Sequence, residues 1–470
     1  MTFLIVAILL LGYIAIATEH ITRINKAATA MFLGVMGWIL YMIEGSSYVN
    51  MFHHAEYESF LNGMASTATT VKAFIANHVF LQHIAEISQI VLFLLATMAI
   101  VDVLNANGCF DFIYECCRTK NSRKLIWYLA ASSFIISANL DNLTTTVMML
   151  AIMRKIVVET RFRMIYGSVI VLAANCGGCF TVIGDINSLV LWTKGVVTPS
   201  DFSMSLAVPA LVAMILPTYL ISRKLPEHIT IDSLRTVYRG DDSFLSRWQR
   251  ILMLFIGIGG LWFIPTFHNI TKLPPFVGAL CVLAVFWVVN EFCNSSLINA
   301  SFVGSRTVPR SLQYDNLQTI LYFIGLALAA GAIYETGAFR FAASWLDTHV
   351  HNIYIVSAIL GVVSGILDNV ALVLSSINMY DILSPEQVAA SADSAYASLF
   401  MQNGAYWQLI AFCGGVGGCL LPIGSIAGYA LMKNENVSIW WYFRMMTGKV
   451  LLGWIAGLVI FFLMNISVLA

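Results

Sequence analysis

Long apolar runs alternate with short polar breaks along the whole chain. Runs long enough to cross a bilayer, about 17 to 25 residues, lie at residues 3–20, 27–43, 84–104, 164–192, 204–221, 250–266, 274–291, 316–334, 405–432 and 447–467. Two further apolar runs, 126–152 and 352–381, each carry a polar Leu-Asp-Asn triplet near their middle. The pattern therefore predicts about ten membrane spans and two segments of another kind.

Composition supports this prediction. Hydrophobic residues make up 59% of the 470 residues and charged residues only 11%, against about 25% charged residues in soluble domains. Such a chain is typical of an all-α polytopic membrane protein whose main partner is the lipid bilayer. Because the formal net charge is zero, no nucleic-acid partner is expected.

The Lys and Arg residues indicate which side of the membrane each loop faces. If 126–152 and 352–381 are re-entrant hairpins, all basic residues fall on one side except Lys72, Lys194, Lys272 and Arg340. The basic side is predicted to be cytoplasmic, with both termini periplasmic. The first hairpin has basic clusters at both ends, so it should open to the cytoplasm. The second precedes an acidic loop without basic residues and should open outward.

Three sequence matches in the same order indicate an internal repeat. The pairs are SANLDN (137–142) with SGILDN (364–369), GGCFTVIGDI (177–186) with GGCLLPIGSI (417–426), and NGCFDF (107–112) with TGAFRF (336–341). Because the two hairpins open to opposite faces, the repeats are predicted to be inverted. Inverted repeats with broken helices near the midplane are typical of secondary transporters.

The repeat also predicts where the chain divides. The predicted parts are a first repeat at 1–221 with the hairpin 126–152 and a broken helix 164–192, a cytoplasmic linker at 222–250, and a second repeat at 251–470 with the hairpin 352–381 and a broken helix 405–432. No separate soluble domain is expected.

Polar residues at the two hairpin tips and helix breaks form the candidate site. Acids inside a membrane are costly and usually functional, and a twice-repeated acid without a nearby basic partner favours cation binding. The candidate ligands are Ser137, Asp141, Asn142, Thr144, Asn175, Asp185, Asn187, Ser188, Ser364, Asp368, Asn369 and Ser425. Asp141, Asp185 and Asp368 are the predicted sodium ligands, and each should take a cation or a proton in turn. Ser425 stands where Asp185 stands in the first repeat.

Other polar residues have less demanding explanations. Membrane hydroxyls also pack between helices or bond to the preceding turn. The CGGC pair, Cys176 and Cys179, is not repeated in the second half of the chain. This argues against a redox or metal-binding role for the two cysteines. The outer-loop histidines are expected to lie in a solvated or interfacial loop rather than to bind metal or sense pH; they are His53, His54, His78 and His83. Glu19 and Glu86, near span ends, are expected to reach water.

The motifs resemble those of the NhaD-type bacterial sodium/proton antiporters, members of the ion transporter superfamily. The resemblance rests on SANLDNLTTT, AANCGG followed by IGD, the second LDN, and the early EH with INKAA. It implies a homodimeric inner-membrane protein with scaffold and transport parts that move by an elevator-like step. Asn187 and Ser188 replace the threonines usual after IGD, and Val182 and Ala371 replace prolines.

The predicted function is Na⁺ (and Li⁺) exchange for H⁺ by alternating access, without catalysis and without a resident cofactor. Two rivals share the superfamily: a sodium-coupled carboxylate symporter, for which both hairpin tips are unexpectedly acidic, and an arsenite exporter. An intramembrane aspartyl protease is disfavoured because such enzymes need G-x-G-D, and Val182 occupies the first glycine position.

Overall fold

Every regular element in the described part of the chain is helical. The computed structural model describes residues 2–229, 245–294 and 314–469, and Asn121 and His228 form an isolated β-bridge. The helices long and apolar enough to span a membrane are Lys26–Ile43, Ala68–Ala106, Pro199–Ser222, Arg247–Thr271, Pro275–Asn294, Leu317–Glu335 and Ile439–Asn465. The chain is thus an all-α polytopic membrane protein, as predicted.

The three remaining predicted spans are the shorter first helix and two interrupted helices. The helices of the first half are α1 (Thr2–Ala17), α2 (Glu19–Thr22), α3 (Lys26–Ile43), α4 (Gly45–Phe52), α5 (His54–Leu61), α6 (Ala68–Phe74), a π-helical segment (Ile75–Phe80), α7 (Leu81–Ala106), α8 (Asp111–Cys117), α9 (Ser122–Ser137), α10 (Asn142–Ile156), α11 (Thr160–Gly178), α12 (Ile186–Thr193) and α13 (Pro199–Ser222). The predicted linker 222–250 lies partly outside the described residues.

The second half contains a similar succession of helices. They are α14 (Arg247–Thr271), α15 (Pro275–Asn294), α17 (Tyr314–Glu335), α18 (Ala338–His349), α19 (Ile353–Ser364), α20 (Asn369–Ile377), α21 (Pro385–Ala389), α22 (Ser394–Ser398), α23 (Ala405–Gly417), α24 (Ile426–Glu435), α25 (Ile439–Tyr442), a π-helical segment (Phe443–Thr447) and α26 (Gly448–Leu469). Both predicted hairpin segments are helix pairs, α9–α10 and α19–α20, broken at Leu-Asp-Asn.

The two halves of the chain are interleaved. Helix α3 packs along α17, α15 packs along α7, and α13 packs along α26. Inside this frame, α9 packs on α11 and α19 on α23, while α10 contacts α24 and α12 contacts α20. Helices of each half therefore pack against the hairpin and the broken helix of the other half.

Glycines allow the hairpins to approach the broken helices. A Cβ on Gly177 would overlap the carbonyl group of Phe134, and a Cβ on Gly417 would overlap that of Gly361. The first pair joins α11 to α9 and the second joins α23 to α19, so both halves use glycine at a matching contact. Small residues of this kind let helix backbones meet closely in membranes.

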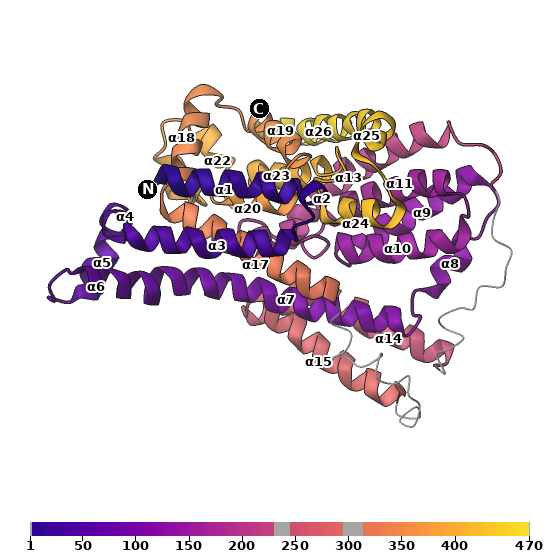
Figure 1. Ribbon diagram of the computed structural model, residues 1–470, viewed down its shortest axis with the longest axis horizontal. Helices are drawn as coiled ribbons and strands as arrows, with labels where there is room; N and C mark the ends of the chain where they lie inside the picture. Colours follow the sequence, from indigo (N-terminus) through magenta and orange to yellow (C-terminus); the bar gives the residue numbers. More distant parts are fainter. Residues whose placement is uncertain (1, 230–244, 295–313, 470) are drawn as a thin grey trace.

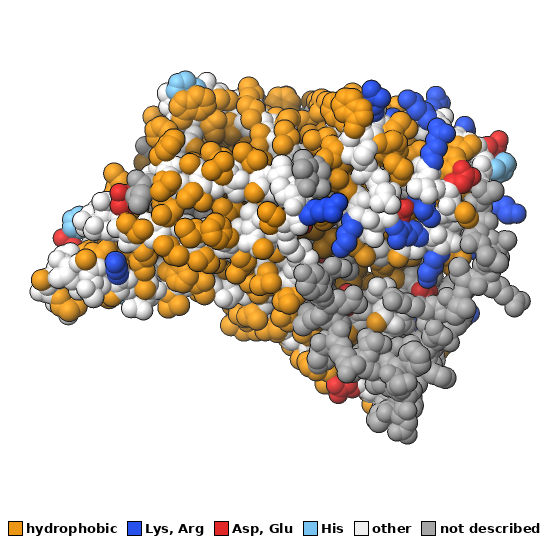
Figure 2. Space-filling model, in the orientation of Figure 1, with side chains coloured by type: hydrophobic (Ala, Val, Ile, Leu, Met, Phe, Trp, Pro, Cys, Tyr) orange, Lys and Arg blue, Asp and Glu red, His pale blue; other side chains and the backbone are white. Residues whose placement is uncertain are grey.

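The long axis of the molecule runs along α1, α3 and α7 (Figure 1). The N-terminus lies at the same end as α4, α5 and α6, whereas α8, α9 and α10 lie toward the other end (Figure 1). Figure 2 shows hydrophobic side chains across the middle of this face and most of its visible Lys and Arg side chains at the end away from α4–α6. This distribution agrees with the charge asymmetry in the sequence.

The contact between α3 and α17 predicts a stability effect. A Cβ on Gly325 would overlap the backbone of Ala30 and Met31. Gly325→Ala should therefore lower the free energy of unfolding by about 1–3 kcal/mol, measured as a lower melting temperature in detergent. Gly448→Ala is the matched control, because nothing lies within 4 Å of its Cβ position. Equal melting temperatures for the two variants would contradict the expectation.

Candidate functional site

Four helix starts carry the motif residues. Asp141, Asp185, Asp368 and Ser425 are the N-caps of α10, α12, α20 and α24. Their side-chain oxygens accept hydrogen bonds from the first backbone N–H groups of those helices, such as Leu143 N to Asp141 Oδ1 at 2.9 Å. Because helix starts have a positive potential, the backbone itself helps to stabilise the three aspartates, each of which caps a helix.

Asp141 and Asp185 face a common small cavity. Its wall also includes Thr97 of α7 and Asn139, and the rest is mostly apolar. Asp185 is 2% exposed. In the described part of the chain, no Lys or Arg lies within ion-pair distance of either aspartate. Two acids without a basic partner carry negative charge that an external cation can balance.

Asp368 is different, because it has a basic partner. Lys26 Nζ lies 3.7 Å from Asp368 Oδ2, and their side chains are 10% and 4% exposed. The ammonium group also lies 4.6 Å from the ring centre of Tyr322 and 5.6 Å from that of Tyr429. The expectation that the repeated acids lack a basic partner is therefore wrong for Asp368. Lys26 is counted with the cytoplasmic loops by charge, yet it is buried.

The three aspartates are thus divided between two cavities. Asp368 lines a second small cavity together with Lys26, Tyr429 and Glu19. Asp185 nevertheless interacts electrostatically with both Asp141 and Asp368. Among the residues that the structure describes, no group of three His, Cys, Asp or Glu side chains is arranged to hold a metal ion. Glu19 is only 8% exposed, so the expectation that it reaches water is wrong.

Several predicted ligands instead hold the hairpins in place. Ser137 Oγ donates to the Ala174 carbonyl at 2.6 Å, and Ser364 Oγ donates to that of Gly414 at 2.9 Å. Each bond ties the end of a hairpin helix to a broken helix. These two hydroxyls therefore support the tips.

The asparagines differ between the two tips. Asn142 Nδ2 donates to Asn175 Oδ1 at 3.1 Å, and Asn175 Nδ2 donates to the Val171 carbonyl at 2.9 Å. In contrast, Asn369 Nδ2 is buried without a hydrogen-bond partner. The first tip is thus tied to its broken helix by an amide pair that the second tip does not have.

The polar residues around Asp141 and Asp185 also make different hydrogen bonds. Thr144 Oγ1 donates to Asp141 Oδ2, and Ser188 Oγ donates to the Asp185 carbonyl at 3.0 Å. Asn187 Nδ2 donates to Asp185 Oδ2 at 3.2 Å, while Asn187 Oδ1 is buried without a partner. A free carbonyl oxygen beside a carboxylate suits a small cation, which prefers oxygen ligands.

Comparisons with known proteins agree with this arrangement. A family model described as "Citrate transporter" matches residues 13–401. Sodium/proton antiporter 2 of Arabidopsis thaliana is 30% identical over 95% of this chain and 96% of its own length. Na(+)/H(+) antiporter NhaD of Vibrio cholerae is 28% identical over 82% of this chain and 80% of its own. The chain belongs to the citrate transporter family, among the NhaD-type sodium/proton antiporters.

A second plant relative extends the similarity. Sodium/proton antiporter 1 of Arabidopsis thaliana is 32% identical to this chain. The match covers 95% of this chain and 70% of the length of the plant protein. The resemblance inferred from LDN and IGD is therefore confirmed, and sodium/proton antiporters similar to this chain occur in both a plant and bacteria.

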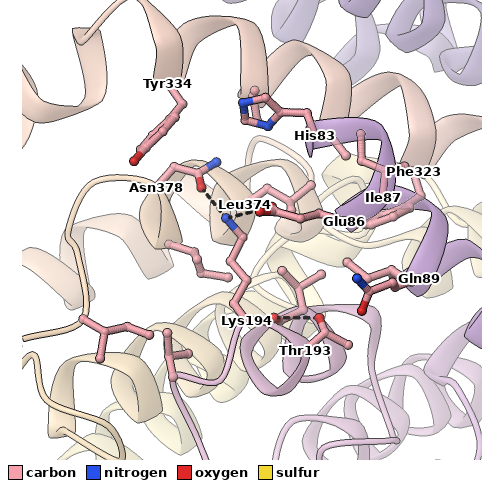
Figure 3. A pocket seen from close by; sticks show the side chains of 18 of the residues that line it. His83, Glu86, Ile87, Gln89, Thr193, Lys194, Phe323, Tyr334, Leu374 and Asn378 are labelled. Carbon is pink, nitrogen blue, oxygen red and sulfur yellow. Dashed lines mark hydrogen bonds and ion pairs between the residues drawn. The ribbon is translucent and has the colours of Figure 1, made fainter. Parts of the chain in front are cut away.

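This NhaD-type chain also has a large hollow of about 420 Å³. No motif in the sequence indicates it. It lies between α7 and α17 on one side and α12 and α20 on the other. Lys194 crosses it, donating to Asn378 Oδ1 at 2.9 Å and pairing with Glu86 Oε2 at 3.7 Å (Figure 3). Because Lys194 and Asn378 follow the ends of α12 and α20, the hollow lies at the opposite ends of those helices from Asp185 and Asp368.

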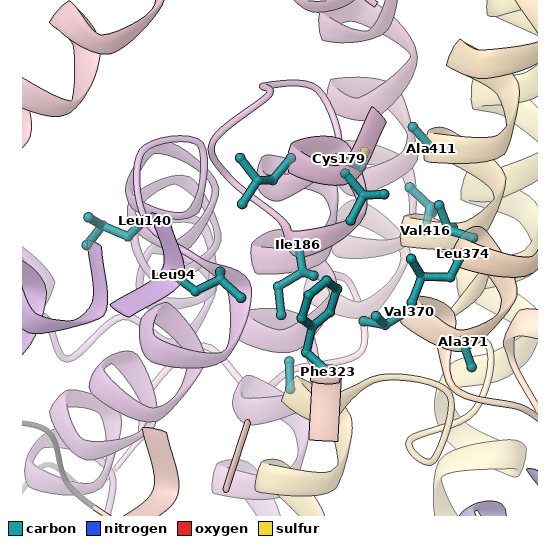
Figure 4. Packing of buried hydrophobic residues seen from close by; sticks show 14 of the residues in the cluster. Leu94, Leu140, Cys179, Ile186, Phe323, Val370, Ala371, Leu374, Ala411 and Val416 are labelled. Atoms are coloured by element: carbon teal, nitrogen blue, oxygen red, sulfur yellow. The ribbon is translucent and has the colours of Figure 1, made fainter. Parts of the chain in front are cut away.

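An apolar layer lies between this hollow and the aspartates. Phe323 of α17 lies between Ile186 of α12 and Val370 of α20 (Figure 4), and all three are buried. Ile186 and Val370 are within two residues of Asp185 and Asp368. Buried apolar side chains therefore lie directly beside both helix starts.

The outer-loop histidines are not all solvated in this NhaD-type chain. Glu335, with a side chain 5% exposed, accepts from His53 Nε2 at 2.6 Å and from His83 Nε2 at 2.8 Å. The side chains of His53 and His83 are therefore only partly exposed, whereas that of His54 is exposed. The cluster joins the loop after α4 to α7 and to the end of α17.

The His53 contact predicts a pH effect. The hydrogen bond to Glu335 raises the pKa of His53 above its usual value, and Glu56 and His83 are the other titratable groups of the cluster. The stabilisation should be complete below about pH 6.5 and should be lost as the pH rises through the folded value. Amide hydrogen exchange in α4 and α5, corrected for intrinsic rates, should be faster at pH 9 than at pH 6.

His53→Gln should show the faster exchange at both pH values, because glutamine carries no titrating charge. His54→Gln is the control, since His54 is exposed, and it should behave like the wild type. A pH dependence in His53→Gln equal to that of the wild type would refute the assignment.

Proposed function

We propose that this chain exchanges Na⁺, and Li⁺, for H⁺ across its membrane by alternating access. The observation that carries the proposal is the cavity shared by Asp141 and Asp185, both without a basic partner in the described residues. Two carboxylates that face one small, mostly apolar cavity are costly to keep both charged and uncompensated. Binding either a cation or a proton relieves that cost, and binding of one excludes the other.

Alternating access requires two related halves, and we propose the inverted repeats at 1–221 and 251–470. The matching contacts support this division, because a Cβ on Gly184 would crowd the Ser137 carbonyl and one on Gly424 would crowd that of Ser364. We further propose that the frame of α3, α7, α15 and α17 is the scaffold. The hairpins and broken helices would then be the moving part, with the apolar layer opening as they slide.

Sodium-dependent proton flux in proteoliposomes tests the proposal. Liposomes with an imposed pH gradient should lose it on addition of Na⁺ or Li⁺ and keep it with choline. The result that contradicts the proposal is an unchanged gradient with every cation. Repeating the assay at two membrane potentials also shows whether the exchange moves net charge.

A sodium-coupled carboxylate symporter is the second candidate, favoured by the description of the matching family model as citrate transporter. Uptake of labelled citrate that depends on Na⁺ would support it, whereas uptake equal to that of empty liposomes would exclude it. Arsenite export has no specific observation in its favour here.

We also propose the cellular setting. A bacterial inner membrane, both termini on the outer face and a homodimer follow from the charge pattern and the resemblance to bacterial antiporters, and the protein should need no cofactor. Labelling of single cysteines placed after Thr2 and before Leu469 from each side of the membrane tests the orientation. Crosslinking in native membranes tests the dimer.

A further inference from the structure

A basic hollow lies away from the aspartates, where the start of α11, the end of α13 and the start of α26 meet. Its volume is about 500 Å³. Arg161, Lys224 and Lys449 line it, one from each of these three regions of the chain. All three belong to loops and helix ends that are predicted to face the cytoplasm.

The three cations of this hollow are not neutralised by any of the residues that the structure describes. None of the described residues that line it is acidic, and none of the three cations has an ion-pair partner in the described part of the chain. Lys224 and Lys449 line the same hollow, so like charges face one space. An anion supplied from outside would therefore lower the electrostatic energy of this place.

Apolar surface continues from the hollow into the membrane. Phe162 and Met445 form part of its wall. Beyond it, α26 exposes Leu452, which is 54% exposed, and α13 exposes Tyr219, which is 44% exposed. Because α13 and α26 pack along each other, both exposed side chains lie on the helix pair that borders the hollow. Such a surface fits acyl chains, which a free anion does not have.

We propose that this hollow binds the headgroup of an anionic phospholipid from the cytoplasmic leaflet. The lipid phosphate would contact Arg161, Lys224 and Lys449, and its acyl chains would lie along α13 and α26. Basic pockets between membrane helices on the cytoplasmic side are known to hold anionic headgroups. The bound lipid would join the start of α11, whose other end carries the motif residues, to α13 and α26.

The melting temperature of the full-length protein in detergent tests the proposal. The protein is titrated with phosphatidylglycerol, phosphatidylcholine or inorganic phosphate. Phosphatidylglycerol should raise the melting temperature more than phosphatidylcholine does, since binding to the folded state stabilises it. Arg161→Gln/Lys224→Gln/Lys449→Gln should lose at least half of that difference, and the single change Arg161→Gln, at an exposed position, should lose part of it.

The matched control removes three other basic residues near a cytoplasmic helix start. Arg118→Gln/Arg123→Gln/Lys124→Gln changes exposed positions outside the hollow and should keep the full phosphatidylglycerol effect. An equal effect in both triple variants overturns the site. A gain from inorganic phosphate as large as that from phosphatidylglycerol overturns the lipid assignment. Neither result depends on transport activity, so they leave the proposed exchange untouched.

Discussion

Asp185→Asn is expected to reduce sodium-dependent proton flux by roughly 100-fold or more. In the proposed exchange Asp185 is a cation ligand, and loss of a ligand costs at least as much as loss of a supporting residue. Asp185 is buried and shares its cavity with Asp141. Asparagine keeps the shape and can still accept from the backbone of α12, but it removes the charge that a cation or a proton must balance. The measurement is flux in proteoliposomes at matched protein content.

Asp141→Asn should give a loss of the same size, because both acids face one cavity. Asp201→Asn is the control: it makes the same chemical change at an exposed position in the first turn of α13 and should leave the flux unchanged. Melting temperatures close to that of the wild type show that the variants fold. Wild-type flux in Asp185→Asn would remove the basis of the proposed exchange.

Lys26→Gln is expected to lower the free energy of unfolding by about 3–5 kcal/mol, the usual cost of leaving one partner of a buried ion pair uncompensated. Lys26 and Asp368 are both buried and come from opposite halves of the chain. The melting temperature in sodium-free detergent measures the loss. Adding NaCl, compared with choline chloride, should stabilise Lys26→Gln more than the wild type, because Na⁺ can then take the place of the ammonium group beside Asp368.

The double variant Lys26→Gln/Asp368→Asn should recover most of the lost stability, because it removes both charges together. Arg23→Gln, at an exposed position just before α3, is the charge-matched control and should melt like the wild type. If the double variant is no more stable than Lys26→Gln, the pair does not account for the loss.

Much of the fold follows from local sequence patterns. Apolar runs of spanning length became helices because a helix satisfies its own backbone in lipid. The interruptions were also visible, since Asp141 and Asp368 stand where a helix restarts and an aspartate is a favourable N-cap. The NhaD-type assignment rested on these same short motifs and was confirmed by the comparisons.

The contacts of the site were less predictable. Lys26 looked like a loop residue because its charge and position suit a cytoplasmic helix end. Glu335 was not among the predicted site residues, and the histidines that bind it were expected to belong to an outer loop. No sequence pattern indicates the contact between Lys194 and Asn378. In each case the partners are far apart in sequence, so only packing brings them together.

The sequence by itself determined the membrane class, the positions of the helix breaks and the three aspartates, because hydrophobic length, helix capping and motif spacing act over a few neighbouring residues. Only the tertiary structure decided which aspartates share a cavity and which one is already paired. That division depends on α3 crossing α17 and on α12 meeting α20, contacts between the two halves of the chain that no local pattern specifies.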